Sequence, residues 1–336
     1  MMRVLNITNG DGAANLIKAS EAEGDVLPWR DTMHHGPFPP GLGLDELSAV
    51  RARYFAGSND DPTPFERDFR LRDEHLRAAS DYDAVLLWYE HDLLDQLQVL
   101  QLLDWFADAD LGATSVDLIC IDRFEGVEPF RGIGQLDAGQ MATLIGQRRP
   151  VSEAQKQLAR AGWRAFRSHD PGALLAFMAR DLSALPFLRA ALRRHLEEYP
   201  AYQTGLTRSE EQILRLVADG VCTAHGLFEQ NMALETALFI GDWPTFSIIA
   251  DLCSGALLRC EPDNEFRFRP SEGASEASVR DQRFRITELG AQILAGHRDA
   301  FDCIRRDRWL GGVHLLCEKP MWVWNATTET LQIREP

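Results

Sequence analysis

The sequence predicts an α/β fold, with an N-terminal Rossmann-like parallel sheet, a helical middle segment and a C-terminal winged helix-turn-helix-like domain. Two observations carry this prediction. Apolar strand-like runs alternate with helix-like segments over residues 1–125, and three helical patterns followed by a hairpin pattern occupy residues 201–296. The 336 residues suffice for two or three domains that each bury a core. Residues 126–200 form the helical segment, and residues 297–336 are expected to fold back as a closing strand or hairpin.

The predicted strands of the first domain alternate with helices along the chain. The residues at 83–89 are apolar on both faces, as strands buried inside a parallel sheet require. Glycines at 10 and 12 separate the first strand from the first helix. The expected strands are 3–8, 25–28, 83–89 and 116–121, and the expected helices are 13–19, 44–56, 64–79 and 93–106.

The rest of the chain is mainly helical before its last strands. Thr207-Arg208-Ser209-Glu210 has the pattern of a capping box, so a helix should begin there. Short strand runs at 257–260, 266–269 and 284–286 surround a polar tip at 270–281. The expected helices are 137–145, 152–167, 171–178, 182–198, 207–218, 224–232, 244–254 and 288–295.

The predicted winged helix differs from a typical DNA reader. The helix that would enter the DNA groove, 244–254, has no Lys or Arg, whereas base edges and phosphates require polar and cationic side chains. The wing carries several arginines: Arg267, Arg269, Arg280, Arg283 and Arg285. We therefore interpret this domain as a surface for a protein partner or for homo-oligomerisation, and we disfavour nucleic acid as the partner.

Composition and charge restrict the function further. The net charge is −16, and residues 1–125 hold 10 Lys and Arg against 24 Asp and Glu. Such a field repels phosphate backbones and attracts divalent cations. No run approaches the roughly 20 apolar residues of a membrane span, and the N-terminus lacks the apolar core of a signal peptide, so we expect a cytoplasmic protein with no membrane partner. The six cysteines form no Cys-x-x-Cys pair and are expected to be buried reduced thiols.

Several motifs in a fixed order resemble a bacterial family described as domain of unknown function 1835, over most of the chain. The motifs are Asn9-Gly10-Asp11, Val26-Leu27-Pro28-Trp29-Arg30-Asp31 with His34 and Gly36-Pro37, Leu87-Trp88-Tyr89-Glu90-His91-Asp92-Leu93-Leu94-Asp95-Gln96-Leu97, Ala184-Leu185-Pro186-Phe187-Leu188 with Arg193-Arg194-His195-Leu196, Thr287-Glu288-Leu289-Gly290, and Trp309-Leu310-Gly311-Gly312-Val313-His314-Leu315. The chain departs from this pattern at His35, where similar chains usually have an acidic residue, and at Pro28. The resemblance implies an N-terminal α/β domain with a winged-helix-like region and brings no activity with it.

The candidate site lies where three predicted strands end, because ligands bind beyond the carboxyl ends of the strands in open α/β sheets. We expect proton transfer or catalysis from one set of side chains, which is His91, Glu90, Asp92 and His34. We expect ligand binding from a second set, which is Asn9, Gly10, Asp11, Gly12, Trp29, Arg30, Asp31 and Gln96. Trp29 would stack on a base or sugar, and Arg30 would neutralise an anion. Asp11, Glu90 and Asp92 could hold a divalent cation, although the sequence does not identify the metal.

Structural roles compete with these functional ones. Asp11 and Asp92 could each cap a helix, and Arg30 could pair with a nearby carboxylate. Asp95, one turn into its helix, is expected to be solvated, whereas Gln96 should point back to the sheet edge.

The sequence leaves three functions open. The first is a domain that binds a phosphate- or nucleotide-containing small ligand, and that, as an enzyme, would be a hydrolase or phosphotransferase. The second is a transcriptional regulator that senses a ligand and binds DNA through its winged helix. The third is an interaction scaffold in which the polar cluster is structural.

Overall fold

The computed structural model describes residues 2–20, 22–57, 61–262, 266, 268, 279–317 and 319–335, in a mixed α/β fold. The chain forms two compact units, Met1–Leu192 with Gly311–Val313, and Arg193–Leu310 with His314–Pro336. The four-part division expected from the sequence stays a prediction. No described helix is both long and apolar enough to cross a bilayer.

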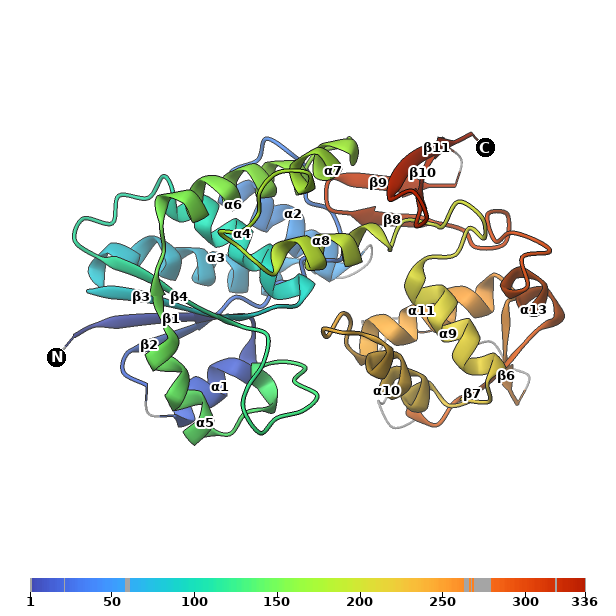
Figure 1. The fold of residues 1–336 in the computed structure, drawn as a ribbon, viewed down its shortest axis with the longest axis horizontal. Helices are drawn as coiled ribbons and strands as arrows, with labels where there is room; N and C mark the ends of the chain where they lie inside the picture. Colours follow the sequence, from blue (N-terminus) through green and yellow to red (C-terminus); the bar gives the residue numbers. More distant parts are fainter. Residues whose placement is uncertain are drawn as a thin grey trace. The chain divides into compact units, whose positions relative to one another are not determined.

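A five-stranded sheet with the order β2-β1-β3-β4-β5 forms the centre of the first unit (Figure 1). β1 pairs in parallel with β2 and β3, and β3 pairs in parallel with β4. Every residue of β1 and β3 is buried, which confirms the interior parallel strands that their apolar runs predict. The strands are β1 (Val4–Thr8), β2 (Asp25–Pro28), β3 (Ala84–Glu90), β4 (Ser115–Ile121) and β5 (Arg149–Pro150).

Helices cover both faces of this sheet. Figure 1 shows α1 and α5 on one face and α4 and α6 on the other. On the α1 face, Leu86 and Trp88 of β3 pack with Ile17 of α1 and Met141 of α5 in one buried cluster. The helices are α1 (Asp11–Ala19), α2 (Leu44–Ala56), α3 (Thr63–Arg77), α4 (Leu93–Phe106), α5 (Ala138–Thr143), α6 (Glu153–Phe166), α7 (Gly172–Met178) and α8 (Leu188–Leu196), with short 3-10 helices η1 (Ala78–Asp81), η2 (Ile133–Gln135) and η3 (Leu144–Gln147).

Two features of the first unit differ from the sequence prediction. The helix expected at 182–198 begins only at Leu188, and residues 183–187 form turns and a bend. Pro186 accounts for this, because proline has no backbone N–H and disfavours the helical conformation in the residue before it. The short strand β5 was not predicted. Its two residues lie antiparallel to β4, with Asp117 opposite Pro150 and Leu118 opposite Arg149.

The second unit contains the helices and the antiparallel pair that the winged-helix prediction requires. Its elements are α9 (Arg208–Ala218), α10 (Ala224–Leu234), α11 (Asp242–Ser254), β6 (Leu258–Glu261), β7 (Arg283–Ile286), α13 (Glu288–Leu294), β8 (Asp307–Leu310), β9 (Val313–Leu316), β10 (Met321–Asn325) and β11 (Thr330–Arg334). The capping box is confirmed, since the Thr207 hydroxyl accepts from the Glu210 N–H and Glu210 accepts from the Thr207 N–H. Arg267, Arg269 and most of the predicted tip fall outside the described residues, so the winged-helix assignment stays a prediction.

Hairpins occupy the end of the chain, where a closing strand or hairpin was expected. β8 and β9 form one two-stranded sheet, and β10 and β11 form another that is antiparallel. None of the six cysteines, all of which lie in the described part of the chain, forms a disulfide. Cys260 is buried and the other five are partly exposed, which corrects the expectation that all the thiols are buried.

A buried ionic network stabilises the second unit. Glu198 accepts hydrogen bonds from Arg194 (2.8 Å), the Ser209 hydroxyl (2.6 Å) and Arg308 (2.7 Å). Burial alone would raise the pKa of Glu198, but the charges of Arg194 and Arg308 hold it at about 2. Glu198 is therefore ionised at neutral pH.

Candidate functional site

The strand order places a topological switch point between β1 and β3. From β1 the chain adds β2 on one side, and it later adds β3 on the other side (Figure 1). Ligands in open α/β sheets bind in the crevice beyond the carboxyl ends of the strands at such a point. Asn9 follows β1 there, and Glu90 ends β3 at the same edge of the sheet.

Three carboxyl groups meet at this edge, and we call Glu90, Asp92 and Asp95 the acidic cluster. One carboxylate oxygen from each of the three lies within 4.8 Å of the others. Their exposed fractions are 3%, 3% and 0%. No described lysine or arginine forms an ion pair with any of them. The cluster is thus a buried group of like charges, which normally requires protons or a cation.

Asp95 is the residue that sequence reasoning missed, because it was expected to be solvated. Its Oδ1 accepts from the Asn9 side-chain amide at 2.8 Å, and its Oδ2 accepts from the Glu90 backbone N–H at 2.7 Å. Asp92 caps α4, accepting at Oδ1 from the Asp95 N–H at 2.8 Å. Through these two hydrogen bonds the buried Asp95 carboxylate joins the loop after β1 to the end of β3.

Burial raises the pKa of every carboxyl in the acidic cluster. It raises the pKa of Asp92 to about 7. It also raises the pKa values of Glu90 and Asp95 well above their ordinary range, and the neighbouring carboxylates raise them further. Glu90 and Asp92 share a side-chain hydrogen bond. The metal-free cluster therefore retains protons at neutral pH.

The loop after β4 covers Glu90. The backbone N–H of Ile133 donates to Glu90 Oε2. Gly132 has a φ of +157°, and any side chain at this position would collide with the Glu90 carboxyl group. The loop can approach the acidic cluster this closely only because residue 132 is glycine.

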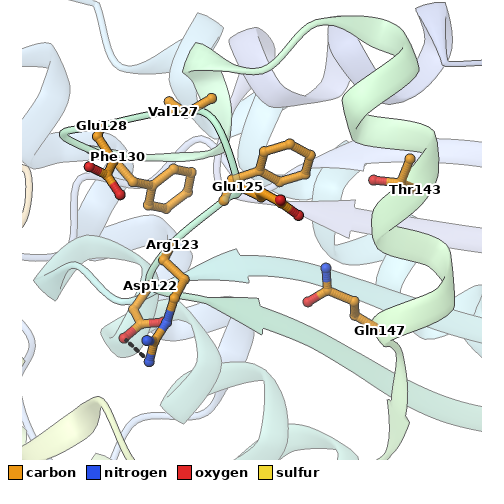
Figure 2. A pocket seen from close by; sticks show the side chains of 9 residues that line it. Asp122, Arg123, Glu125, Val127, Glu128, Phe130, Thr143 and Gln147 are labelled. Carbon is orange, nitrogen blue, oxygen red and sulfur yellow. Dashed lines mark hydrogen bonds and ion pairs between the residues drawn. The ribbon is translucent and has the colours of Figure 1, made fainter.

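A cavity of about 570 Å³ lies along the same loop. Figure 2 shows Glu125 and Phe130 on the loop side of the cavity, with Thr143 and Gln147 across from them. The ring of Phe130 also packs on that of His91, with the ring centroids 6.1 Å apart and the planes 29° apart. The cavity and the acidic cluster are thus connected through residues 130–133. Sequence reasoning did not single out any of the residues that line this cavity.

Arg30 and Asp11 form a separate, exposed pair. Arg30 donates from Nε and Nη2 to the Asp11 carboxylate at 2.7–3.0 Å. These hydrogen bonds lower the pKa of Asp11. Arg30 has a φ of 45°, a conformation that residues other than glycine rarely adopt. Asp11 is the first residue of α1 and makes no side-chain cap, and Gly10 is the N-cap.

Two predicted ligand-binding residues point into the protein interior. Trp29 is completely buried, donates from Nε1 to Gln101 at 2.9 Å, and lies 3.9 Å below the guanidinium of Arg72. Asp31 is buried against Arg51 at 2.7 Å. The expected stacking of Trp29 on a ligand is therefore corrected, because its ring is enclosed by protein on all sides.

The remaining predicted residues lie near the sheet edge in different environments. His34 is buried, with its ring 4.3 Å from that of His35. His91 is partly exposed between Phe130 and Phe187. Gln96 points back to the sheet edge as predicted, and donates to the Glu90 backbone carbonyl at 2.8 Å. This hydrogen bond attaches the end of β3 to α4. Gly12 borders open space, since no atom lies near the position of an added Cβ.

The structure therefore brings Asn9, Glu90 and Asp92 together with Asp95, and separates from them the pair Arg30–Asp11 and the interior residues Trp29 and Asp31. Comparison with protein-family models and with curated proteins gave no match to this chain.

Proposed function

We propose that the acidic cluster binds a divalent cation, and that this cation holds a phosphate-bearing small ligand at the switch point of the sheet. The proposal rests on one observation, which is that three buried carboxyl groups offer oxygens within 4.8 Å of one another. Mg²⁺, Mn²⁺ and Ca²⁺ are bound by carboxylate oxygens, and Mg²⁺ sites commonly combine one or two carboxylates with substrate phosphates and water.

The energetics of burial support a cation here. Ionised carboxylates in the interior are costly unless a positive charge compensates them. Among the described residues, hydrogen bonds from Asn9 and from backbone N–H groups are the compensation that the cluster receives. A divalent cation would replace the retained protons, so its binding should release protons and strengthen with rising pH.

The surroundings of the cluster support a phosphate-bearing ligand. The N-terminus of α1 lies at the same sheet edge, and helix N-termini bind anions through free N–H groups. Arg30 offsets the charge of Asp11 at this position. The nearby cavity, with Phe130 in its wall, has the volume of a small-molecule site. A bound cation would polarise phosphoryl oxygens and acidify a bound water, so hydrolysis or phosphoryl transfer is the reaction class we favour.

Calorimetric titration with MnCl2, followed by ADP as a phosphate-bearing probe, tests both parts. We expect the wild-type protein to bind Mn²⁺ at pH 8 with proton release, and to bind ADP more tightly once Mn²⁺ is present. Asp92→Asn should abolish Mn²⁺ binding, because it removes a carboxylate and keeps the helix cap. Asp110→Asn is the control, since Asp110 is exposed in the segment before β4 at the opposite sheet edge.

The two parts fail separately. Absence of Mn²⁺ binding, or equal binding by the Asp92→Asn variant, would overturn the cation site. Binding of Mn²⁺ without any effect on ADP would retain the cation and reject the phosphate ligand.

A further inference from the structure

The acidic cluster is closed to solvent, so a cation cannot reach it in the observed conformation. The exposed fractions of Glu90, Asp92 and Asp95 are 3% or less. One part of the enclosure consists of β3, α4 and the loop after β1, which hydrogen bonds of Asp95 and Gln96 join to one another. The other part is the segment after β4, residues 123–136, which we call the covering loop (Figure 2).

The covering loop has few polar connections to the rest of the first unit. The Gln135 side chain accepts from the Gly132 N–H at 3.2 Å, and the other hydrogen bonds and ion pairs of the loop likewise join its own residues or the residue directly before it. Among the described residues, a single hydrogen bond leads elsewhere, from the Ile133 N–H to Glu90 Oε2. A segment connected in this way can open locally while the sheet and its helices stay folded.

Apolar packing and a close fit favour the closed position of the covering loop. Phe130 and Ile133 pack with Ile17 of α1 in the buried cluster on that face of the sheet. Gly132 lies against the Glu90 carboxyl group, and an added Cβ at this position would collide with it. The closed loop therefore requires glycine at position 132, whereas a loop that has moved away from Glu90 does not.

We propose that the covering loop is a gate through which the cation enters and leaves the acidic cluster, an inference that rests on the cation site proposed above. The loop opens when the Ile133 N–H separates from Glu90 and the Phe130 ring moves away from His91. Because the closed loop blocks the site, a cation binds only during these openings. At high cation concentration the rate of binding is therefore limited by the rate of opening.

Gly132→Ala and Gly134→Ala test the opening in the metal-free, full-length protein. Both add one methyl group to the same loop, but no atom lies within 4 Å of a Cβ at Gly134. We expect Gly132→Ala to accelerate hydrogen exchange at the Ile133 N–H about tenfold or more and to leave exchange in β3 unchanged, and Gly134→Ala to exchange as wild type does. Phe130→Leu, which weakens the packing of the loop, should also accelerate it and replaces Gly132→Ala if that variant does not fold. Equal exchange in all these proteins would reject the gate.

Stopped-flow mixing with MnCl2 measures entry of the cation. Mn²⁺ quenches the fluorescence of nearby indoles, and Trp88 lies in β3 two residues before Glu90. We expect the observed rate for wild type to reach a plateau as the MnCl2 concentration rises, and Gly132→Ala to raise this plateau about tenfold or more while Gly134→Ala leaves it unchanged. A rate that rises linearly without a plateau, or the same plateau in Gly132→Ala, would reject the gate and retain the cation site. Absence of any Mn²⁺ binding would instead overturn the cation site, and the gate with it.

Discussion

Asp92 contributes to the first unit through an oxygen atom and through a charge, and these contributions can be separated. Its Oδ1 caps α4, and asparagine caps helices as well as aspartate does. Its charge lies close to the carboxyl groups of Glu90 and Asp95, and it raises the pKa values of both in addition to the effect of burial. Asp92→Asn should therefore leave the metal-free protein at least as stable as wild type at pH 8, as measured by urea unfolding. A loss of more than about 2 kcal/mol would show that the charge itself stabilises the fold.

The pH dependence of the same variant gives a second prediction. The pKa of Asp92 is about 7 in the folded protein, and about 3.9 is expected in the unfolded chain. The folded state therefore binds more protons between these values, so the contribution of Asp92 to stability falls as pH rises from about 4 to about 7. The free energy of unfolding of wild type relative to Asp92→Asn should decrease over this range by on the order of 2 to 4 kcal/mol. A difference that stays constant with pH would contradict the raised pKa.

The contribution of Glu198 to stability depends on pH in the opposite sense to that of Asp92, because arginines surround the Glu198 carboxylate. Glu198→Gln leaves Arg194 and Arg308 without their shared carboxylate, and should cost about 3 to 5 kcal/mol in urea unfolding at pH 7. The lowered pKa means that this contribution is complete above about pH 4.5 and is lost as pH falls toward 2. Glu211→Gln is the control, since its exposed pair with Arg215 should contribute about 0.5 kcal/mol or less. Equal losses in the two variants would contradict the importance of burial.

At the scale of elements, one helix holds the candidate site together. Four polar residues of α4 each bond to a strand end or to the loop after it. Asp95 bonds to Asn9 and Glu90, and Gln96 donates to the carbonyl of Glu90. Gln98 donates to the carbonyls of Asn9 and Asp31, and Gln101 accepts from Trp29. The loops after β1 and β2 and the end of β3 are thereby fixed to a single helix, so α4 positions the site as a unit.

Gln98→Met tests this role of α4. The substitution retains the volume of the side chain and removes the donor to two backbone carbonyls, which should cost about 2 kcal/mol in unfolding free energy. Hydrogen exchange should also accelerate at the Trp29 N–H, which bonds to Thr8 between the two loops. The control is Gln292→Met on α13, where the amide bonds to Glu288 at the surface. Unchanged exchange at Trp29 would indicate that the loops are fixed by other contacts.

The elements were more predictable from the sequence than the site was. Uniformly apolar residues made β3 recognisable, and the proposed cap at Asp92 is present. Asp95 escaped because charged residues are seldom buried, and because its partner Asn9 is 86 positions away in the chain. The available signal was the set of polar residues at 95, 96, 98 and 101, which interrupt a largely apolar helix. The prediction that Trp29 stacks on a ligand was wrong because the contact that covers its ring comes from a distant residue. A tryptophan at a strand end beside an arginine gives no indication that Arg72 lies over its ring.

At the scale of the whole molecule, each compact unit contains its own buried ionisable group. The acidic cluster lies in the first unit, and the network around Glu198 lies in the second. Units with separate cores often unfold in separate transitions. The acidic cluster and Glu198 can therefore serve as independent reporters of the two units.

Differential scanning calorimetry tests this independence. We expect two transitions, and Glu198→Gln should lower the one that belongs to the second unit. Saturating MnCl2 should raise only the other transition, because a ligand stabilises the unit that binds it, by about 2.7 kcal/mol at a concentration a hundred times its Kd. Asp92→Asn should abolish the Mn²⁺ effect and leave the Glu198-dependent transition unchanged, and the double variant should show both effects additively. A single transition that responds to both changes would mean that the two units unfold together.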